Sequence, residues 1–205
     1  MSDRPPSAAR AEVVRAVERA LSKHGYAGLT TKNVAAESDK SEAFFFYHYD
    51  TKDDLVVAFL DWAIERNRER LAALDDDPVV RLYDALDVLV GDPTDDVDRG
   101  INVAMMELLS HAPHNDRFRE RLTAYEQSVI DLFVEIVREG IEGGVFRDVD
   151  PEDVAGYLLV TANGTAGAAM ALRMDAVDAA VRRELDRYLR TTVLREGVSP
   201  PADVL

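Results

Sequence analysis

A run of aromatic residues offers the side chains best suited to contacts outside the chain's own core. Residues 44–49 read FFFYHY and hold five of the 15 aromatic residues, which are seven Phe, seven Tyr and one Trp. Six consecutive positions cannot all face one core, because neighbouring side chains on a helix or a strand point in different directions. Some of these rings, and the imidazole of His48, are therefore expected to contact another molecule.

Catalytic and metal-binding patterns are missing from the sequence. It contains no Ser-His-Asp order, Walker loop, dinucleotide fingerprint or His-Glu-x-x-His motif, so we predict that the chain is not an enzyme. His111, His114 and Asp116 are residue types that bind metals, but their spacing in an expected loop fixes no coordination geometry. We expect no metal site and no cofactor. The absence of cysteine excludes disulfides and suits a reducing, cytoplasmic compartment.

The charge of the chain is unevenly distributed. The formal net charge is −15, and such acidity alone argues against a nucleic-acid partner. Residues 1–55, however, hold 8 Lys or Arg and 9 Asp or Glu, and all four lysines lie there. The N-terminal quarter is thus nearly neutral, whereas the rest of the chain carries almost all of the net negative charge. An acidic, lysine-poor surface is typical of halophilic proteins, in which net charge maintains solubility, although an ordinary acidic protein would have a similar composition.

The elements that position these residues are expected to be helices. Helical spacing of apolar residues extends over residues 7–24, and short helices are expected at 30–38 and 41–49. Thr51 and Asp54 form a capping-box pattern before a long helix that reaches residue 74. Further helices are expected at 79–90, 99–112, 114–142, 151–173 and 176–195, the fourth of these with Asp150 as its N-cap. No run approaches the ~20 apolar residues of a membrane span, and residues 196–205 are expected to form a flexible tail.

Two short helices joined by a tight turn, between a first helix and a long connecting one, form the layout of a helix-turn-helix head. The stretch GLTTKNVAAESDKSEAFFFYHYDTKDDL, residues 28–55, resembles the TetR family of transcriptional regulators. The matching positions are Thr30, Val34, Ala35, Ser38, Ser41, Phe45, Phe46, Tyr49, Lys52 and Leu55. The resemblance implies an all-α fold with a DNA-binding head at residues 1–55 and a ligand-binding and dimerisation body at residues 56–195. It implies a ligand-responsive repressor that binds a palindromic operator in double-stranded DNA as a homodimer.

The resemblance also implies which residues contact DNA. Ser41 would begin the recognition helix, and Phe45 and Tyr49 would pack that helix onto the long one. Phe44 would face base edges, where a ring can contact thymine methyl groups. Tyr47, His48 and Lys52 would bind phosphates. The full set of expected DNA-binding residues is Thr30, Thr31, Lys32, Lys40, Ser41, Glu42, Phe44, Phe46, Tyr47, His48 and Lys52. The alternative is that the aromatic residues form only the small core of a three-helix subdomain.

Several departures from the family pattern affect the expected DNA contacts. Asp39 occupies the turn position where glycine is usual, and Lys40 replaces an apolar residue. Phe46 replaces the common tyrosine and so lacks a hydroxyl for phosphate. Glu42 adds a charge that DNA would repel unless it accepts from N4 of cytosine. A protein of the same fold that binds small molecules or acts as a scaffold, with weak or lost DNA binding, is therefore the alternative function.

The body is expected to bind a second copy of the chain and a small apolar effector. Thr161, Gly164 and Ala168 share one helical face, and such small residues let two helices approach closely, although the same stripe could pack within one subunit. Glu107 is either a buried anion for a cationic ligand or an exposed residue. The expected pocket is lined by Phe59, Trp62, Tyr83, Met105, Met106, Leu109, Tyr125 and Phe133, although most positions of this kind are simply core.

Overall fold

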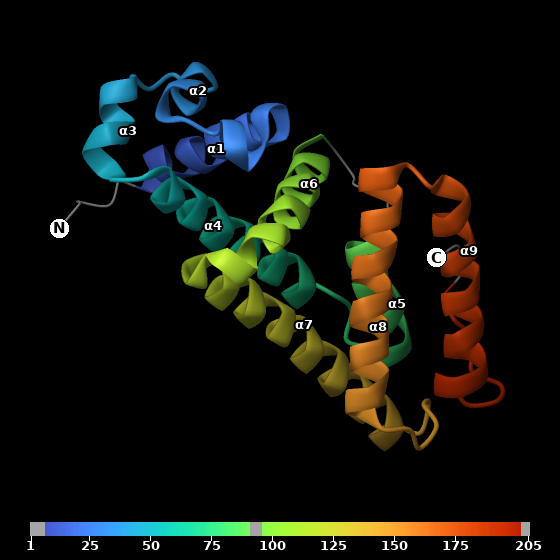
Figure 1. The fold of residues 1–205 in the computed structure, drawn as a ribbon. Coiled ribbons are helices and arrows are strands. Elements are labelled where there is room, and N and C mark those ends of the chain that lie inside the picture. The colour runs from blue at the N-terminus through green and yellow to red at the C-terminus, as the bar shows by residue number, and fades with distance from the viewer. Residues whose placement is uncertain (1–6, 91–95, 202–205) are drawn as a thin grey trace. The chain divides into compact units, whose positions relative to one another are not determined.

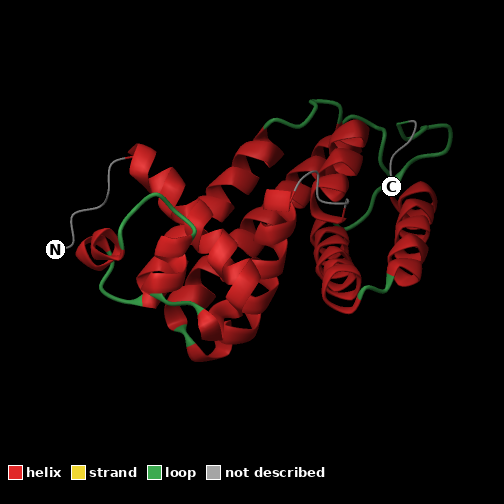
Figure 2. Cartoon of the chain, turned by 90° about the horizontal axis from the view of Figure 1, so that it is seen from above, coloured by secondary structure: helices red, strands yellow, loops and turns green. Residues whose placement is uncertain are grey.

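The computed structural model describes residues 7–90 and 96–201, and every regular element in those ranges is a helix (Figures 1 and 2). This confirms the all-α prediction. The α-helices are α1 (Ser7–Gly28), α2 (Thr31–Ala36), α3 (Glu42–His48), α4 (Lys52–Ala72), α5 (Pro78–Val90), α6 (Asp96–His111), α7 (Asp116–Glu142), α8 (Pro151–Ala166) and α9 (Asp175–Tyr188). No helix in the described ranges is both long and apolar enough to cross a membrane.

Three details differ from the regular helices that the sequence pattern predicts. Gly25 has a positive φ of 64°, so α1 is kinked there and its last turn continues to Gly28. A short 3-10 helix, Ala112–His114, precedes α7. The helices α8 and α9 each end in a π-helical segment, Gly167–Ala171 and Leu189–Val193. A 3.6-residue repeat of apolar positions carries no signal for these local changes of winding.

The chain divides into two compact units. Unit 1 comprises Met1–Asn67 and Pro93–Thr123, and unit 2 comprises Arg68–Asp92 and Ala124–Leu205. The helices α4 and α7 therefore each contribute residues to both units. The assignment of DNA binding to residues 1–55, and of ligand binding and dimerisation to residues 56–195, remains a prediction about function. The flexibility expected for residues 196–205 also remains a prediction, and residues 202–205 lie outside the described ranges.

The core of unit 1 joins the first helices to α4, α6 and the start of α7. Val17 of α1, Phe45 of α3 and Phe59 of α4 are fully buried in this core. Leu108 of α6 and Phe118 of α7 complete it from the later part of the unit. The head helices thus do not form a separate small core, because their apolar side chains continue into those of α4, α6 and α7.

In unit 2, the loop between α7 and α8 contacts the segment that follows α9. Phe146, in the loop between α7 and α8, is fully buried, and an added Cβ at Gly140 would lie 2.1 Å from its ring. Phe146 forms an isolated antiparallel bridge with Leu194. Two arginines flank this bridge: Nε of Arg147 donates to the Leu194 carbonyl at 2.7 Å, and Nε of Arg195 donates to the Phe146 carbonyl at 2.9 Å. The reciprocal pair attaches the end of the last helix to the α7–α8 loop.

Candidate nucleic-acid interface

The helices α2 and α3 are delimited by side-chain caps. The hydroxyl of Thr30 accepts from the Asn33 N–H at 3.1 Å, and that of Ser41 accepts from the Phe44 N–H at 3.3 Å. Each cap satisfies a backbone donor that a helix start leaves without an intrahelical partner. The structure therefore places Ser41 at the start of the second helix of the pair, as the sequence predicts.

The turn between α2 and α3 is attached to α1 by charged groups. The backbone N–H of Asp39 donates to Glu12 at 3.0 Å, and the ammonium of Lys40 lies 3.1 Å from the same carboxylate. The hydrogen bonds from Lys40 and Asp39 hold the pKa of Glu12 below its ordinary value. Glu37, at the end of α2, accepts two hydrogen bonds of 2.8 Å from Lys23 of α1. Lys40, expected to bind DNA, thus also neutralises an acidic side chain of the head.

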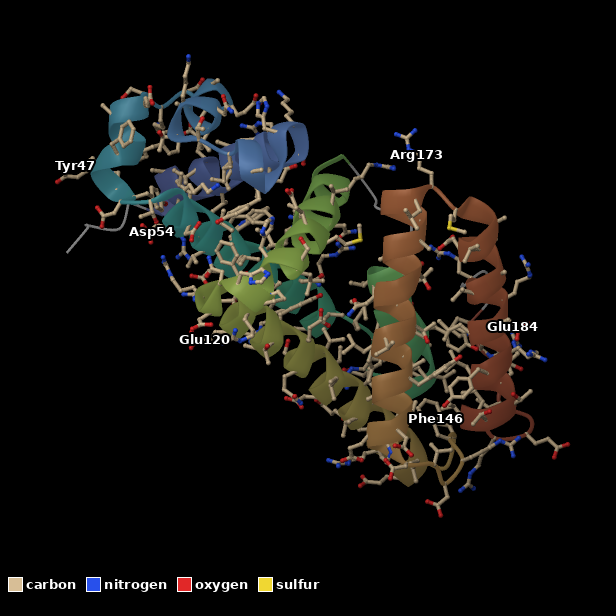
Figure 3. The ribbon with its side chains drawn as sticks, viewed as in Figure 1. Tyr47, Asp54, Glu120, Phe146, Arg173 and Glu184 are labelled. Atoms are coloured by element: carbon tan, nitrogen blue, oxygen red, sulfur yellow. The ribbon has the colours of Figure 1, made fainter. Side chains whose placement is uncertain are left out.

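The aromatic run divides into buried and exposed rings. Phe45 is 0% exposed and Tyr49 is 7% exposed, whereas Phe46 and Tyr47 are 59% and 71% exposed. Figure 3 shows Tyr47 pointing away from the helices of its own unit. Phe44 is half-buried, and its ring centroid lies 4.5 Å from that of His48. A core role accounts for Phe45 and Tyr49, but it does not account for the two exposed rings.

The remaining polar residues of the pair lie around these rings. Thr30, Lys32, Ser41 and Glu42 are exposed, and Thr31 is half-buried. The hydroxyl of Thr31 lies 3.4 Å from Oε1 of Glu42, which connects α2 with the first turn of α3. Glu42 and Phe46 are four residues apart and so share one edge of α3. The exposed side of the pair therefore combines hydroxyls, one lysine, one carboxylate and two aromatic rings.

Lys52 lies at the start of α4, where its ammonium contacts Tyr26. It donates to the Tyr26 carbonyl at 3.2 Å and lies 4.1 Å from the centroid of the Tyr26 ring. The Tyr26 hydroxyl donates to Asp53 at 2.6 Å. Burial, and then the hydrogen bond to Asp53, raise the pKa of Tyr26 to about 12. Lys52 thus has protein partners in addition to any phosphate that it would bind.

Tyr26 also connects the head with α6 and α7 within unit 1. Its backbone N–H donates to Glu107 of α6 at 2.6 Å, and its ring lies 4.4 Å from the His111 ring and 5.6 Å from the Phe118 ring. Sequence reasoning missed this role, because the two partners in the Tyr26–Glu107 bond are 81 positions apart and no local pattern links them. Glu107 is half-buried and engaged by the protein, so the alternative of an exposed residue does not describe it.

The residues expected to line an effector pocket are distributed over both units. In unit 1, Phe59 is fully buried, Trp62, Met105 and Met106 are half-buried, and Leu109 is 41% exposed. In unit 2, Tyr83 and Phe133 are fully buried and Tyr125 is half-buried. The Tyr83 hydroxyl donates to Asp186 at 2.9 Å. A hollow of about 350 Å³ on α7 is lined by other residues: Asp131, Val134, Glu135, Arg138, Glu139 and Glu142.

Glu126 is a carboxylate in unit 2 whose surroundings disfavour its charge. It lies on α7 and accepts from Nδ2 of Asn163, on α8, at 3.2 Å. Burial raises its pKa, and the hydrogen bond from Asn163 only partly opposes that rise. Among the described residues, no group of three or more His, Cys, Asp or Glu side chains is arranged to hold a metal ion.

The small-residue stripe lies on a face of α8 that carries exposed apolar side chains. Gly164 is exposed, and a Cβ added there would have no atom within 4 Å. Thr161 and Ala168 are half-buried. Tyr157 and Val160, on the same helix, are 45% and 71% exposed. Figures 1 and 2 both show α8 and α9 side by side, and Leu172, Met174 and Val177 add further exposed apolar surface around the turn that joins them.

Comparison with known proteins identifies both parts of the chain. Residues 13–59 match the family model for bacterial regulatory proteins of the tetR family, and residues 78–194 match that for the C-terminal part of BetI-type transcriptional repressors. A TetR transcription regulator from Haloarcula marismortui is 35% identical, with a TM-score of 0.84 over 92% of this chain and 100% of the other. No curated protein matches the chain.

Two further solved structures share the fold at lower identity. A protein from Saccharomonospora viridis in complex with choline is 20% identical, with a TM-score of 0.80 over 93% of this chain and 100% of the other. A TetR transcriptional regulator from Chloroflexus aurantiacus is 23% identical, with a TM-score of 0.79 over 90% of this chain and 96% of the other. These two likenesses concern the fold alone.

Proposed function

Because the chain belongs to the TetR family of transcriptional regulators, we propose that it is a ligand-responsive repressor that binds a palindromic operator as a homodimer. Members of this family are regulators rather than enzymes, and they act on DNA in the cytoplasm. The observation that carries the proposal is the exposure of Phe46 and Tyr47 on a capped helix-turn-helix pair. Exposed rings on the outer side of such a pair favour contact with another molecule.

The proposed DNA contacts come from the exposed side of α2 and α3. Thr30, Thr31 and Ser41 offer hydroxyls for phosphates, and we assign Lys32, which is exposed on α2, to a guanine edge. Tyr47 and His48 add a phenol and an imidazole at the end of α3. Lys40, Glu42, Phe44 and Lys52 border this surface. We assign the phosphate contacts to the hydroxyls, including that of Tyr47, and to the cations other than Lys32. We assign the base contacts to Lys32, Glu42 and the ring of Phe46.

The proposed dimer forms through α8 and α9. Large apolar side chains that are exposed in one chain favour burial against a second copy, and Tyr157 and Val160 lie on the helix that carries the small-residue stripe. Open space at Gly164 lets a partner helix approach closely. A two-fold dimer would present two heads to two half-sites, which matches a palindromic operator.

The proposed effector is a small, largely apolar molecule bound in the body. Of the residues expected to line its pocket, Tyr83, Tyr125 and Phe133 lie in unit 2. Glu126 favours an effector that also carries a positive charge, because a cation would stabilise a carboxylate that burial otherwise disfavours. The choline bound by the Saccharomonospora viridis protein is a small cation of this kind. Choline and its analogues are therefore the first compounds to test.

The alternative is a small-molecule-binding or scaffold protein that retains the fold with weak or lost DNA binding. The net charge of −15 and the carboxylate of Glu42 favour it. Selection from random duplexes at two salt concentrations separates the two functions. We expect an inverted repeat whose half-sites are centred about 34–36 Å apart. A folded, dimeric protein that enriches no inverted repeat at either salt concentration would leave the alternative as the function.

A further inference from the structure

We propose that this protein recognises its operator chiefly through apolar contact with thymine methyl groups, made by Phe46, and that its DNA affinity consequently depends only weakly on salt. The inference rests on the proposed function and deepens it by naming the chemistry of recognition. It starts from two observations on the head: the position of Phe46, and the partners of the lysines.

Phe46 is the apolar ring that the head presents outward. It is 59% exposed, whereas Phe44 is half-buried against the core of unit 1 and in ring contact with Phe45 and His48. The exposed ring is therefore that of Phe46, and the thymine contact belongs to Phe46 rather than to Phe44. A phenylalanine has no hydrogen-bonding group for a phosphate, and the apolar feature of a base edge in the major groove is the C5-methyl group of thymine.

Glu42, which lies beside Phe46 on α3, favours contact of this edge with DNA bases rather than with the DNA phosphates. Glu42 precedes Phe46 by one helical turn, and Thr31 holds its carboxylate at 3.4 Å. A carboxylate is repelled by phosphates, but it accepts hydrogen bonds from the amino groups of cytosine and adenine. Glu42 and Phe46 together form an edge that can contact base edges and that has no group to neutralise a phosphate.

Most lysines of the head are already engaged by the protein. Lys23 is paired with Glu37, Lys40 with Glu12, and Lys52 with the carbonyl and ring of Tyr26. Arg19 is also paired with Glu37. Within the described part of the chain, neither an ion pair nor a hydrogen bond is found for Lys32 of α2 or for Arg10 and Arg15 of α1. A phosphate would have to displace an existing partner from each of the others.

The small number of available cations sets the expected salt dependence. The logarithm of the binding constant falls with the logarithm of salt concentration with a slope of about −0.9 per neutralised phosphate. Proteins that make six to ten such contacts have slopes of roughly −5 to −9. Because Lys32 is assigned to a base edge, two heads that each place one or both of Arg10 and Arg15 on phosphates give a slope of about −2 to −4. Apolar contact with methyl groups does not release counterions, so this part of the affinity persists at high salt.

The test uses the operator obtained by selection, with thymine replaced by uracil at each position in turn, which removes one methyl group. We expect a loss of affinity of about fourfold at one or two positions per half-site, the fold-change associated with burying one methyl group. In Phe46→Ala the same replacement should leave the affinity unchanged, while Phe46→Leu should retain part of the discrimination. Val103→Ala removes an exposed apolar side chain of α6 and serves as the control. It should distinguish thymine from uracil as strongly as the unmodified protein does.

The outcomes distinguish this inference from the proposed function. If no operator is enriched, the proposed function itself fails. If an operator is enriched but uracil has no effect at any position, or the effect is equal in Phe46→Ala, recognition by Phe46 is wrong. A salt slope steeper than about −6 would show that phosphate contacts dominate. The uracil series on the unmodified protein does not depend on the folding of any variant.

Discussion

Tyr26 and Glu107 are joined by a 2.6 Å hydrogen bond from the backbone N–H of the first to the carboxylate of the second. The bond lies next to Gly25, where an added Cβ would lie 2.9 Å from Oε1 of Glu107. A second contact repeats the arrangement in the opposite direction: the buried carboxylate of Glu18, on α1, lies where a Cβ of Gly100, on α6, would be. The helices α1 and α6 thus approach closely at two glutamates, each placed against a glycine of the other helix, and Glu107 also accepts a hydrogen bond from α1.

The first prediction concerns this contact. Glu107→Ala removes a charged acceptor from a half-buried N–H, and a loss of about 1.5–3 kcal/mol in the free energy of unfolding is expected. Glu107→Gln keeps an acceptor oxygen and should recover most of the loss. Urea unfolding measures both variants. Glu120→Ala, at an exposed position of α7, is the control and should change stability by less than about 0.5 kcal/mol. Equal stability of Glu107→Ala and the control would contradict the role of the bond.

A second prediction follows from the raised pKa of Glu126. A carboxyl group whose pKa is higher in the folded state binds more protons there, so its ionisation opposes folding and its unfavourable contribution grows as pH rises through the folded-state pKa. Glu126→Gln should therefore raise the free energy of unfolding at pH 7. The gain should disappear well below the pKa of an unfolded glutamate, which is about 4.3.

Urea unfolding of the two proteins at pH 7 and pH 3.5 measures this difference. Glu120→Gln should show no comparable gain at pH 7. A Glu126→Gln variant less stable than the unmodified protein at pH 7 would show that the carboxylate has a favourable partner in solution.

The third prediction tests the dimer surface without disturbing the subunit. A Cβ added at Gly164 has no atom within 4 Å, and replacement by Leu removes a glycine from a helix, which should stabilise the subunit by up to about 1 kcal/mol. The larger side chain should nevertheless prevent close approach of a partner helix and shift the protein towards monomer. Gly164→Ala should remain dimeric. Sedimentation velocity measures the oligomeric state of each variant. A Gly164→Leu variant that remains dimeric would show that the dimer interface does not include this face of α8.

The fourth prediction concerns the exposed lysine of α2. Lys32→Ala should weaken operator binding by about 1–3 kcal/mol and relax the preference at one base pair, as expected for loss of a contact with guanine. Lys23→Ala removes a lysine of α1 that is paired with Glu37 and serves as the control. Competition with every single-base operator variant measures the preference. Uniform weakening on all variants would instead assign Lys32 to a phosphate.

The local part of the fold could be predicted from the sequence. Thr51 and Asp54 form the expected capping box, with reciprocal bonds of 2.8 Å and 3.2 Å, and Asp150 caps α8 through the N–H groups of Glu152 and Asp153. Such motifs depend on residues two or three positions apart, so sequence spacing is sufficient to find them. The motif in residues 28–55 indicated the family, which the comparisons confirm.

The long-range part could not be predicted in the same way. The contacts of Tyr26 with Glu107 and Phe118 depend on the packing of helices far apart in the chain, and a glutamate in an acidic sequence gives no signal of its partner. The same holds for Lys52, since its contact with Tyr26 spans 26 positions. The partners of the head lysines, on which the expected salt dependence rests, became visible only once α1, α2 and α4 were placed within unit 1.

The interleaving of the two units has a consequence for synthesis of the chain on the ribosome. Unit 1 ends at Thr123, whereas unit 2 requires the chain up to the Phe146–Leu194 bridge and its arginines. Domains generally fold as they emerge, N-terminal parts first, so the DNA-binding head can acquire its α6 and α7 supports while α8 and α9 are still unmade. Residues 68–90 belong to unit 2 and pack with partners that are translated last. Nascent chains would therefore be competent to fold a head well before the proposed dimer can form.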